Sequence, residues 1–306
     1  MSQKTYLHVC LPSRDRPILT QKCIESIHSS TSKFDEVCIY VFDNLTDNLD
    51  NRFQIFSKLL KNKTISYYSY DTSESSNKCF PKAPIFRRFI HMMMEKTHLD
   101  KEIGKNNKHY FMLSDNDMIY GPGWDAYFMT AADLLDNRNP TIHFLVRHIG
   151  GIPLSARNRA EYIKVPNRFS NDEIFEVCLA NGGGGSGFWF MSEKMLPKLY
   201  WSIKDLKNTH DQFKRHDTTS WQSIKSKLGP SDPYVAGVVP INEEDPMVLH
   251  MGGIVGSMCN ILNNKVTRNT YLVKRNELFP KESELESLSA LEIYNKFKTT
   301  RQVTVW

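Results

Sequence analysis

Short apolar runs and helically spaced apolar positions take turns over the first 120 residues. Four runs without internal turn residues have the branched and aromatic composition of β-strands, and they cover residues 6–11, 36–42, 65–70 and 110–113. Three segments between them repeat apolar residues at amphipathic-helix spacing, and they cover residues 20–29, 53–60 and 84–96. Strands that alternate with helices predict an α/β domain whose mostly parallel sheet is flanked by helices.

The run at 110–113 ends in two carboxylates one residue apart, Asp115 and Asp117. Its large apolar residues suit a strand covered on both faces, and the Gly-Pro-Gly at 121–123 predicts a turn soon afterwards. Ligands bind at the carboxyl edge of a parallel sheet, where two such oxygen donors suit Mg²⁺ or Mn²⁺ carrying a substrate diphosphate. The structural alternative is a polar turn with a helix-capping aspartate.

Polar side chains also follow the first two predicted strands. Residues 13–16, Ser-Arg-Asp-Arg, come after the first strand, and Asp43 and Asn44 come after the second. Because the carboxyl ends of parallel strands meet at one edge of the sheet, these groups should converge with the acidic pair. Their convergence predicts a nucleotide site.

Composition places the chain among ordinary globular proteins. Its 306 residues are 40% hydrophobic, which is enough for one large domain or for a domain with an appendage. Lys and Arg number 39 against 34 Asp and Glu, a net charge of +5. This balance suits phosphorylated or polyanionic partners but lacks the charge density of a dedicated nucleic-acid binder.

Six cysteines are scattered along the chain without the paired spacing of a zinc site or a disulfide framework. We therefore expect small buried side chains in a reducing compartment, with no disulfide and no structural zinc. The N-terminus lacks a signal-type apolar core, and no run reaches the roughly 18 apolar residues of a membrane span. The sequence thus predicts a cytoplasmic protein without a membrane span.

Three of these segments together resemble the GT-A class of sugar-nucleotide-dependent glycosyltransferases, especially its family-two-like group. VCLPSRDRP at 9–17 is similar to the first strand and nucleotide-binding loop of that class, FDNLTDN at 42–48 to its second-strand motif, and SDNDM at 114–118 to its metal-binding DxD motif. The resemblance covers residues 5–255 and implies a Rossmann-like GT-A fold. It also implies a nucleotide-binding set, Pro12, Ser13, Arg14, Arg16, Asp43, Asp115 and Asn116, and places Mn²⁺ or Mg²⁺ on Asp115 and Asp117.

The segment NKCFPKAPIFRR at 77–88 resembles the part of that class that places basic side chains against the nucleotide. The resemblance assigns Lys82 and Arg87 to donor binding. Cys79 departs from the pattern, because the class usually has a glycine there.

The segment NGGGGSGFWFM at 181–191 joins four glycines to an apolar strand. It resembles a glycine-rich segment that borders the donor sugar and acceptor, which implies Gly184 and Gly185 as donor-site residues. A structural hairpin is the alternative. A phosphate-binding loop is not expected, because no GK[ST] follows.

The stretch 209–228 places Asp211, His216 and Asp217 ahead of a predicted helix. In inverting members of the resembling class an acidic residue here takes the proton from the acceptor hydroxyl, which implies Asp217 as the catalytic base and Asp211 as the second candidate. Asp217 suits a plain N-cap equally well. The sequence leaves open whether transfer inverts or retains.

The segment VLHMGG at 248–253 ends an apolar run at His250. GT-A enzymes often carry a histidine after their last core strand that completes the metal shell, so the resemblance implies His250 as a third ligand. A hydrogen-bonded core histidine is the alternative.

Residues 147–168 predict a long surface loop that faces the acceptor. Its basic side chains suit a polyanion such as DNA bearing hydroxymethylated bases, or simply solvate the loop. A cell-surface polysaccharide or a teichoic-acid-like polymer is an equal alternative, because acceptor loops vary on a fixed scaffold. The basic residues are Arg147, Arg157, Arg159, Lys164 and Arg168.

A C-terminal helix is predicted at 283–298. Its apolar stripe should pack on the core or on a second subunit of a homo-oligomer, because the opposite face carries mostly Glu rather than the Lys and Arg of a membrane-surface helix. The stripe consists of Leu285, Leu288, Leu291, Ile293 and Phe297.

The resemblance implies a GT-A catalytic domain at 1–262, followed by a C-terminal extension at 263–306. Within the catalytic domain, we expect residues 1–120 to form the nucleotide-binding half and residues 121–262 the acceptor-binding half.

The expected activity is metal-dependent transfer of a sugar from a nucleotide-diphosphate sugar, first of all a UDP-sugar, to an acceptor hydroxyl. A nucleotidyltransferase acting on sugar phosphates is one rival, but it should carry a glycine-rich loop after the first strand, where SRDRP has no glycine. A non-catalytic nucleic-acid-binding protein is the other rival. It would explain the basic balance but not the acidic pair, which repels phosphate unless a metal intervenes.

Overall fold

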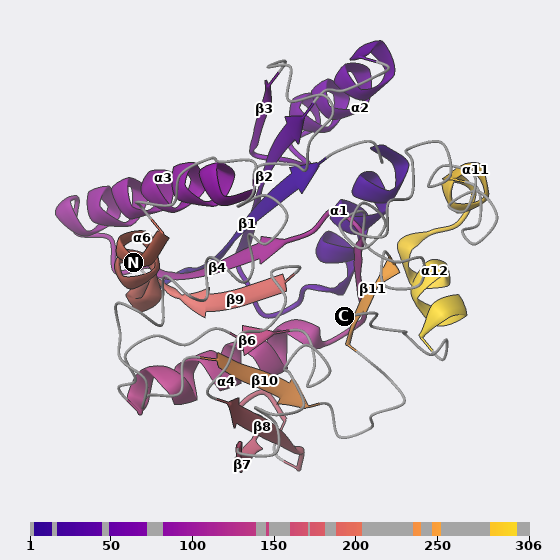
Figure 1. Ribbon diagram of the computed structural model, residues 1–306. Coiled ribbons are helices and arrows are strands. Elements are labelled where there is room, and N and C mark those ends of the chain that lie inside the picture. The colour runs from indigo at the N-terminus through magenta and orange to yellow at the C-terminus, as the bar shows by residue number, and fades with distance from the viewer. Residues whose placement is uncertain are drawn as a thin grey trace, which may run out of the picture.

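A large mixed sheet runs through the part of the chain that the structure describes, with strands in the order β3-β2-β1-β4-β9-β6-β10-β8-β7 (Figure 1). This computed structural model describes residues 3–13, 17–44, 49–71, 82–138, 145–146, 160–170, 172–180, 188–203, 235–239, 247–251 and 282–298. A separate two-stranded ribbon pairs β11 with β5.

The N-terminal half alternates strands and helices, as the apolar pattern predicts. Strands β2, β1 and β4 lie side by side in parallel, and β3 extends the same parallel set. The elements are β1 (Thr5–Ser13), α1 (Pro17–Ser30), β2 (Glu36–Asn44), α2 (Leu49–Lys61), β3 (Tyr67–Asp71), α3 (Lys82–Glu102) and β4 (Lys108–Ser114). The α/β class and the parallel arrangement of this half are confirmed.

The second half adds strands in a mixed arrangement. Strand β9 joins the edge of β4 antiparallel, and β6, β10, β8 and β7 continue the sheet. The elements are β5 (Met118–Tyr120), α4 (Trp124–Asn137), β6 (Leu145–Val146), β7 (Glu161–Pro166), β8 (Ile174–Ala180), β9 (Phe188–Ser192), η2 (Glu193–Met195), α6 (Leu196–Ile203), β10 (Val235–Val239) and β11 (Val248–His250).

The expected acceptor loop at 147–168 is wrong for its last residues, because Glu161–Pro166 form strand β7. This strand pairs antiparallel with β8 along its whole length. The strand contains Tyr162, Ile163 and Val165, which are strand-favouring residues, and the cross-strand pairing and the burial of Val165 agree with that preference. Arg147, Arg157 and Arg159 lie outside the described residues.

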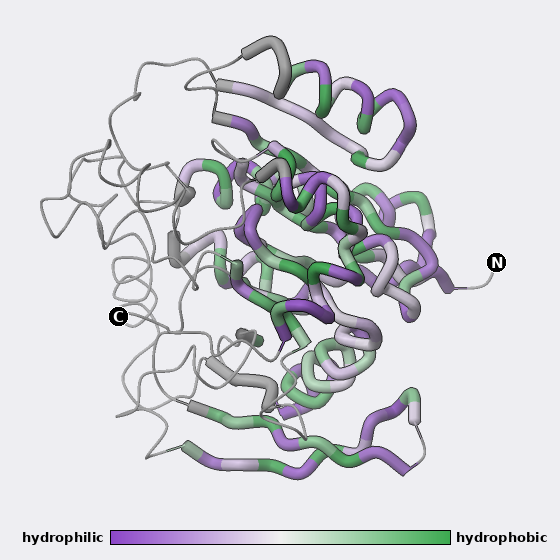
Figure 2. Tube along the Cα trace, turned by 90° about the vertical axis from the view of Figure 1, so that its right-hand side faces the viewer, coloured by the Kyte–Doolittle hydropathy of each residue, from purple (hydrophilic) through white to green (hydrophobic). Residues whose placement is uncertain are grey.

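Helices cover both faces of the sheet, and successive residues of β1 pack against different groups of helices. Val9 and Leu11 join the cluster that includes α1, α2 and α4, whereas Cys10 joins the cluster with α3 and α6. This alternation follows from the two-residue period of a strand. Figure 2 shows hydrophobic and hydrophilic residues interleaved along most segments.

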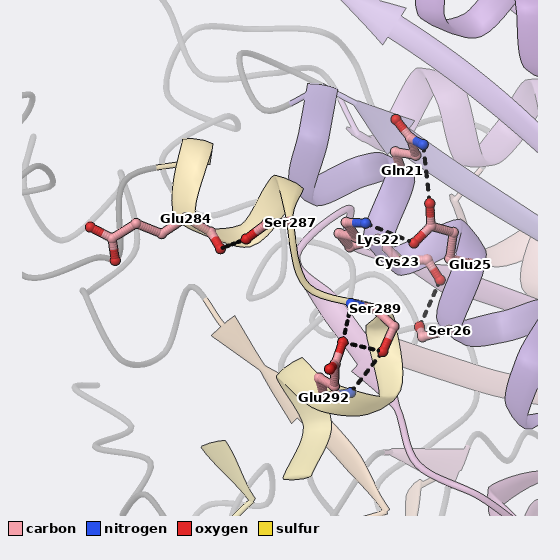
Figure 3. Close-up of polar contacts among 9 residues, drawn as sticks. All are labelled: Gln21, Lys22, Cys23, Glu25, Ser26, Glu284, Ser287, Ser289 and Glu292. Atoms are coloured by element: carbon pink, nitrogen blue, oxygen red, sulfur yellow. Dashed lines mark hydrogen bonds and ion pairs between the residues drawn. The ribbon is translucent and has the colours of Figure 1, made fainter. Parts of the chain in front are cut away.

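The predicted single C-terminal helix is wrong, because the structure has two helices there. Helix α11 spans Glu282–Glu286 and α12 spans Ala290–Phe297. The break occurs where Ser289 caps α12: its hydroxyl accepts from the Glu292 backbone N–H, and the Glu292 carboxylate accepts from the Ser289 backbone N–H (Figure 3). This capping box starts a new helix instead of extending the old one.

The apolar stripe was expected to pack on the core or on a second subunit, and the structure shows it packed on the core. Leu285 and Ile293 are buried beside α1 and the β5–β11 ribbon, whereas Leu291 is exposed. None of the helices in the described ranges has the length and apolar character that crossing a membrane requires.

The described cysteines are small buried side chains, as expected from their apolar surroundings. They have free thiols and are Cys10, Cys23, Cys38 and Cys178. Cys79 and Cys259 lie outside the described residues.

Candidate metal and nucleotide site

Strand β4 ends at the acidic pair. The strand is buried along nearly its whole length, and the chain then turns through residues 115–117 before β5 begins. Asp117 is only 6% exposed, and Asp115 is half-buried. The two carboxylates therefore lie at the carboxyl end of a central parallel strand, where the apolar pattern predicted them.

Strand β11 brings His250 to this turn from the far end of the sequence. In the antiparallel ribbon His250 lies opposite Met118, the residue that follows Asp117. The Met251 backbone N–H donates to the Asp117 carbonyl at 2.8 Å, and the Gly121 N–H donates to the Met247 carbonyl at 2.8 Å. These bonds bracket the ribbon and place His250 Nε2 3.4 Å from Asp117 Oδ1.

Asp115, Asp117 and His250 form a donor set that fits a divalent cation. Their candidate ligand atoms all lie within 4.8 Å of one another. Ligands on opposite sides of an octahedral ion with metal–oxygen distances of about 2.1 Å are about 4.2 Å apart, so small side-chain adjustments bring all three into range. Two carboxylates and an imidazole are common ligands of divalent metals. Among the described residues, this is the one grouping of three such side chains.

Helix α1 supports the turn at residues 115–117 through Thr20. Thr20 Oγ1 accepts a hydrogen bond from Asn116 Nδ2 at 2.9 Å and exchanges another with Ser13 Oγ at 3.1 Å. Ser13 and Thr20 are fully buried. Thr20 therefore ties the end of β1 to the residue between the two aspartates, which limits how the turn is oriented.

Two further α1 side chains, one and two helical turns on, hold the same segment. Cys23 Sγ donates to the Asp115 carbonyl at 3.8 Å, and Ser26 Oγ accepts from the Tyr120 backbone N–H at 3.1 Å. The Tyr120 hydroxyl in turn lies 2.6 Å from Ser114 Oγ. One helix face thus supports the whole segment from the end of β4 to the end of β5.

Two of these supporting groups stay neutral over the physiological range. Burial raises the pKa of the Cys23 thiol, and the charge of Asp117 raises it further. Burial also raises the pKa of the Tyr120 hydroxyl well above its ordinary value. Neither group therefore adds negative charge beside the two carboxylates, and both keep a proton to donate.

The predicted nucleotide residues at the ends of β1 and β2 are neighbours. Ser13 and Asp43 are register partners of the two parallel strands, and Asp43 is buried. The Tyr68 hydroxyl donates to Asp43 Oδ2 at 3.4 Å. Pro12 precedes Ser13 and is buried as well. The sheet brings this pair to the same edge as the acidic turn after β4.

The remaining predicted residues fall into two groups. Lys82 is the first residue of α3, and Arg87 lies one turn into that helix with a half-buried side chain. The others lie outside the described residues: Arg14, Arg16, Gly184, Gly185, Asp211 and Asp217. Their roles stay predictions.

Thr20, Cys23, Ser26 and Tyr120 are the supporting residues that the sequence analysis did not single out. A signal exists, because the three α1 residues are small, capable of hydrogen bonding and spaced by three in the helix directly after the first strand loop. Residues at that spacing share a helix face. What they contact, however, is 92 to 96 positions away in the chain.

No protein-family model and no curated protein matches the sequence. Solved structures do resemble the fold. S. aureus TarS is 11% identical over 96% of this chain and 44% of its own, with a TM-score of 0.44. S. aureus TarS 1–349 in complex with UDP-GlcNAc is 11% identical over 96% and 73% of the two chains, with a TM-score of 0.41.

A third similar structure is the glycosyltransferase GlyE of Streptococcus pneumoniae TIGR4. It is 12% identical over 97% of this chain and 63% of its own, with a TM-score of 0.39. The protein thus spans less than half of the full TarS chain and less than two thirds of GlyE. At such identities and TM-scores the likeness assigns no activity.

Proposed function

We propose that the protein is a metal-dependent glycosyltransferase that moves a sugar from a nucleotide-diphosphate sugar to an acceptor hydroxyl. The observation that supports this most is the grouping of Asp115, Asp117 and His250 at the carboxyl end of β4. Ser13 and Asp43 lie at the carboxyl ends of the neighbouring parallel strands. An acidic metal site beside polar strand ends suits a ligand that carries both a diphosphate and a nucleoside.

The three ligands hold Mn²⁺ or Mg²⁺, and the buried face of α1 keeps the acidic turn in place. When bound, the divalent ion neutralises the developing negative charge on the leaving diphosphate. The carboxylates alone would repel that diphosphate, so donor binding depends on the ion. Asp43 accepts hydrogen bonds from the nucleobase, and Lys82 and Arg87 contribute positive charge toward the phosphates.

The acceptor hydroxyl loses its proton to Asp217, with Asp211 as the second candidate. A direct in-line attack on the anomeric carbon then inverts its configuration. The acceptor is either DNA with hydroxymethylated bases or a glycan polymer, and both present hydroxyl groups along an extended chain. The catalytic unit is residues 1–262, and 263–306 form an extension to it.

Thermal unfolding with and without Mn²⁺ tests the donor class. A ligand that binds only the folded state raises the melting temperature by mass action. UDP-GlcNAc is the first donor to add, followed by other UDP- and GDP-sugars, each with and without EDTA. A shift that appears with one sugar nucleotide and disappears with EDTA supports the proposal.

Product analysis separates the rival activities. Release of nucleoside diphosphate with a glycosylated acceptor supports transfer, whereas release of pyrophosphate from a nucleoside triphosphate and a sugar phosphate identifies a nucleotidyltransferase. If no nucleotide raises the melting temperature in any condition, the enzymatic proposal fails and nucleic-acid binding becomes the leading reading.

A further inference from the structure

The C-terminal helices pack directly on the ribbon that carries the candidate metal ligands. A buried cluster joins Leu285, Ile293 and Tyr294 of these helices to three elements of the site region. Those elements are α1, which supports the acidic turn, and strands β5 and β11. Figure 3 shows α12 and its cap at Ser289 beside α1. The C-terminal helices therefore contact α1 and both strands of the ribbon that places His250 beside Asp117.

The β5–β11 ribbon is covered on both faces. Ile119 and Leu249 are register partners, both fully buried, and they belong to the cluster with the C-terminal helices. Tyr120 and Val248, the next register pair, belong to the main core instead. Because side chains alternate across a strand, the ribbon lies between the main core on one face and α11–α12 on the other.

The Tyr294 ring lies against Gly121, directly after β5. A Cβ atom added at Gly121 would lie 2.3 Å from Tyr294 Cζ and 2.5 Å from its hydroxyl oxygen, closer than real side-chain contacts allow. Gly121 thus permits the aromatic ring to rest on the end of β5. The Gly121 N–H also makes the bond to Met247 that fixes one end of the ribbon.

His250 depends on this support more than the aspartates do. Strand β11 has only three residues, and the pairing of its last residue with Met118 determines where the imidazole lies relative to Asp117. Asp115 and Asp117, in contrast, follow a seven-residue strand in the middle of the large sheet. A change in the cover of the ribbon therefore moves His250 first.

We propose that α11–α12 form a positioning element of the metal site, in which Tyr294 and Ile293 hold β11 in register so that His250 reaches the ion bound by Asp115 and Asp117. This inference rests on the proposed function, because it requires the metal site. It gives the C-terminal extension a role in metal affinity instead of stability alone. Residues that orient metal ligands typically change metal affinity by about 10–100-fold when they are replaced.

The experiment compares variants of the full chain at a temperature where each is folded by circular dichroism. Mn²⁺ affinity is measured by titration followed with electron paramagnetic resonance. Tyr294→Ala and Ile293→Ala remove the contacts with the ribbon, and Tyr294→Phe keeps the ring. Leu291→Ala is the matched control, because Leu291 lies on the same helix with its side chain 50% exposed.

We expect Tyr294→Ala and Ile293→Ala to bind Mn²⁺ at least tenfold more weakly, while Tyr294→Phe and Leu291→Ala bind as the unsubstituted protein does. Hydrogen exchange provides a readout without metal: the Met251 amide should exchange faster in Tyr294→Ala, while the amides of β4 are unchanged. Gly121→Ala displaces the same ring and should reproduce both effects. It decides the question if Tyr294→Ala does not fold.

Unchanged Mn²⁺ affinity in folded Tyr294→Ala and Gly121→Ala overturns the positioning role and leaves the proposed function intact. An equal loss in Leu291→Ala also overturns it, since the effect would then report general stability. If the unsubstituted protein binds no Mn²⁺, the metal site itself is wrong and both proposals fall together.

Discussion

Two histidine–aspartate pairs of the protein have the same nitrogen–oxygen distance but lie in different surroundings. His250 Nε2 lies 3.4 Å from Asp117 Oδ1 at the carboxyl edge of the sheet. His109 Nε2 lies 3.4 Å from Asp100 Oδ2, between the start of β4 and the end of α3. Distance alone does not distinguish a candidate metal site from a buried structural pair.

The surroundings of the second pair are aromatic. His109 exchanges a hydrogen bond with His8 at 3.0 Å and stacks on Tyr6 and His8 with ring centroids 5.2 and 5.3 Å apart. Burial lowers the pKa of His8 to about 3, and burial also lowers the pKa of His109. Both rings therefore stay neutral and fill the space between the sheet and α3.

The first pair differs in having a second carboxylate within reach. Asp115 adds a third candidate ligand, and the topology of parallel strands places the group at the edge where ligands bind. A third donor and a position at the carboxyl edge, more than the geometry of one pair, give a site the chemistry of a metal centre.

The largest effect is expected when the His250–Asp117 pair is broken. Asp117→Ala removes a central ligand, and we expect transfer to fall by at least about 10³-fold, because the charge on the leaving group loses its stabilisation. Asp100→Asn is the matched change in the second pair and should leave both transfer and Mn²⁺ affinity unchanged. Initial rates and Mn²⁺ titrations measure both variants. Full activity of Asp117→Ala would refute the site.

The second effect concerns the stacked imidazoles of His8 and His109, which make the stability of the fold sensitive to acid. The unfolded chain protonates His8 below its ordinary pKa of 6.5, whereas the folded chain does so only near pH 3. The unfolded state therefore binds more protons in this interval, and stability falls as the pH drops from 6.5 toward 3. The slope is up to about 1.4 kcal/mol per pH unit for each such imidazole.

Urea unfolding between pH 7 and pH 4 measures this slope. The double variant His8→Phe/His109→Phe keeps the stacked rings and should flatten the pH dependence. His98→Gln changes an exposed histidine of α3 and should retain it. A double variant with the same slope as the unsubstituted protein would show that the acid sensitivity lies elsewhere.

A smaller effect tests whether Thr20 holds the turn that carries Asp117. Thr20→Val keeps the shape of the side chain but removes the acceptor of the half-buried Asn116 amide and the partner of the buried Ser13 hydroxyl. The loss costs about 2 kcal/mol of unfolding free energy. We expect about tenfold weaker Mn²⁺ binding as well. Thr97→Val makes the same replacement at a buried site in α3, where Thr97 Oγ1 donates to the Met94 carbonyl. It should leave Mn²⁺ affinity unchanged, and a loss there equal to that of Thr20→Val would contradict the role of Thr20.

The smallest effect concerns the cap of α12. Ser289→Ala removes the hydroxyl that accepts from the Glu292 N–H, and a lost N-cap costs about 1 kcal/mol. Ser287→Ala, whose hydroxyl donates to the Glu284 carbonyl outside the cap, is the control. Differential scanning calorimetry should show a lower melting temperature only for Ser289→Ala. Equal melting temperatures would mean that the cap contributes nothing to the docked helices.

The two halves of the chain differ in how far their local apolar patterns predict the fold. In the N-terminal half, strands and helices follow in the predicted order because each is specified by its own apolar period. The strand predicted at 65–70 begins in the structure at Tyr67, two residues later than predicted. The helix predicted at 84–96 extends in the structure to Glu102. In the second half, the mixed strand order depends on partners far away in the sequence, such as β4 with β9, which a local pattern does not encode. The strand at 161–166 instead pairs with the next strand of the chain, β8.

By itself, the sequence determined the local features of the site. An apolar run that stops at Asp115 and Asp117 is a strand that ends in carboxylates, since hydrophobic burial and polar solvation act residue by residue. Only the tertiary structure decided that His250 pairs beside Asp117, that Thr20 supports the turn, and that Tyr294 rests on Gly121. Those contacts join segments separated by about a hundred residues or more, and their geometry depends on how the whole sheet and its covering helices pack.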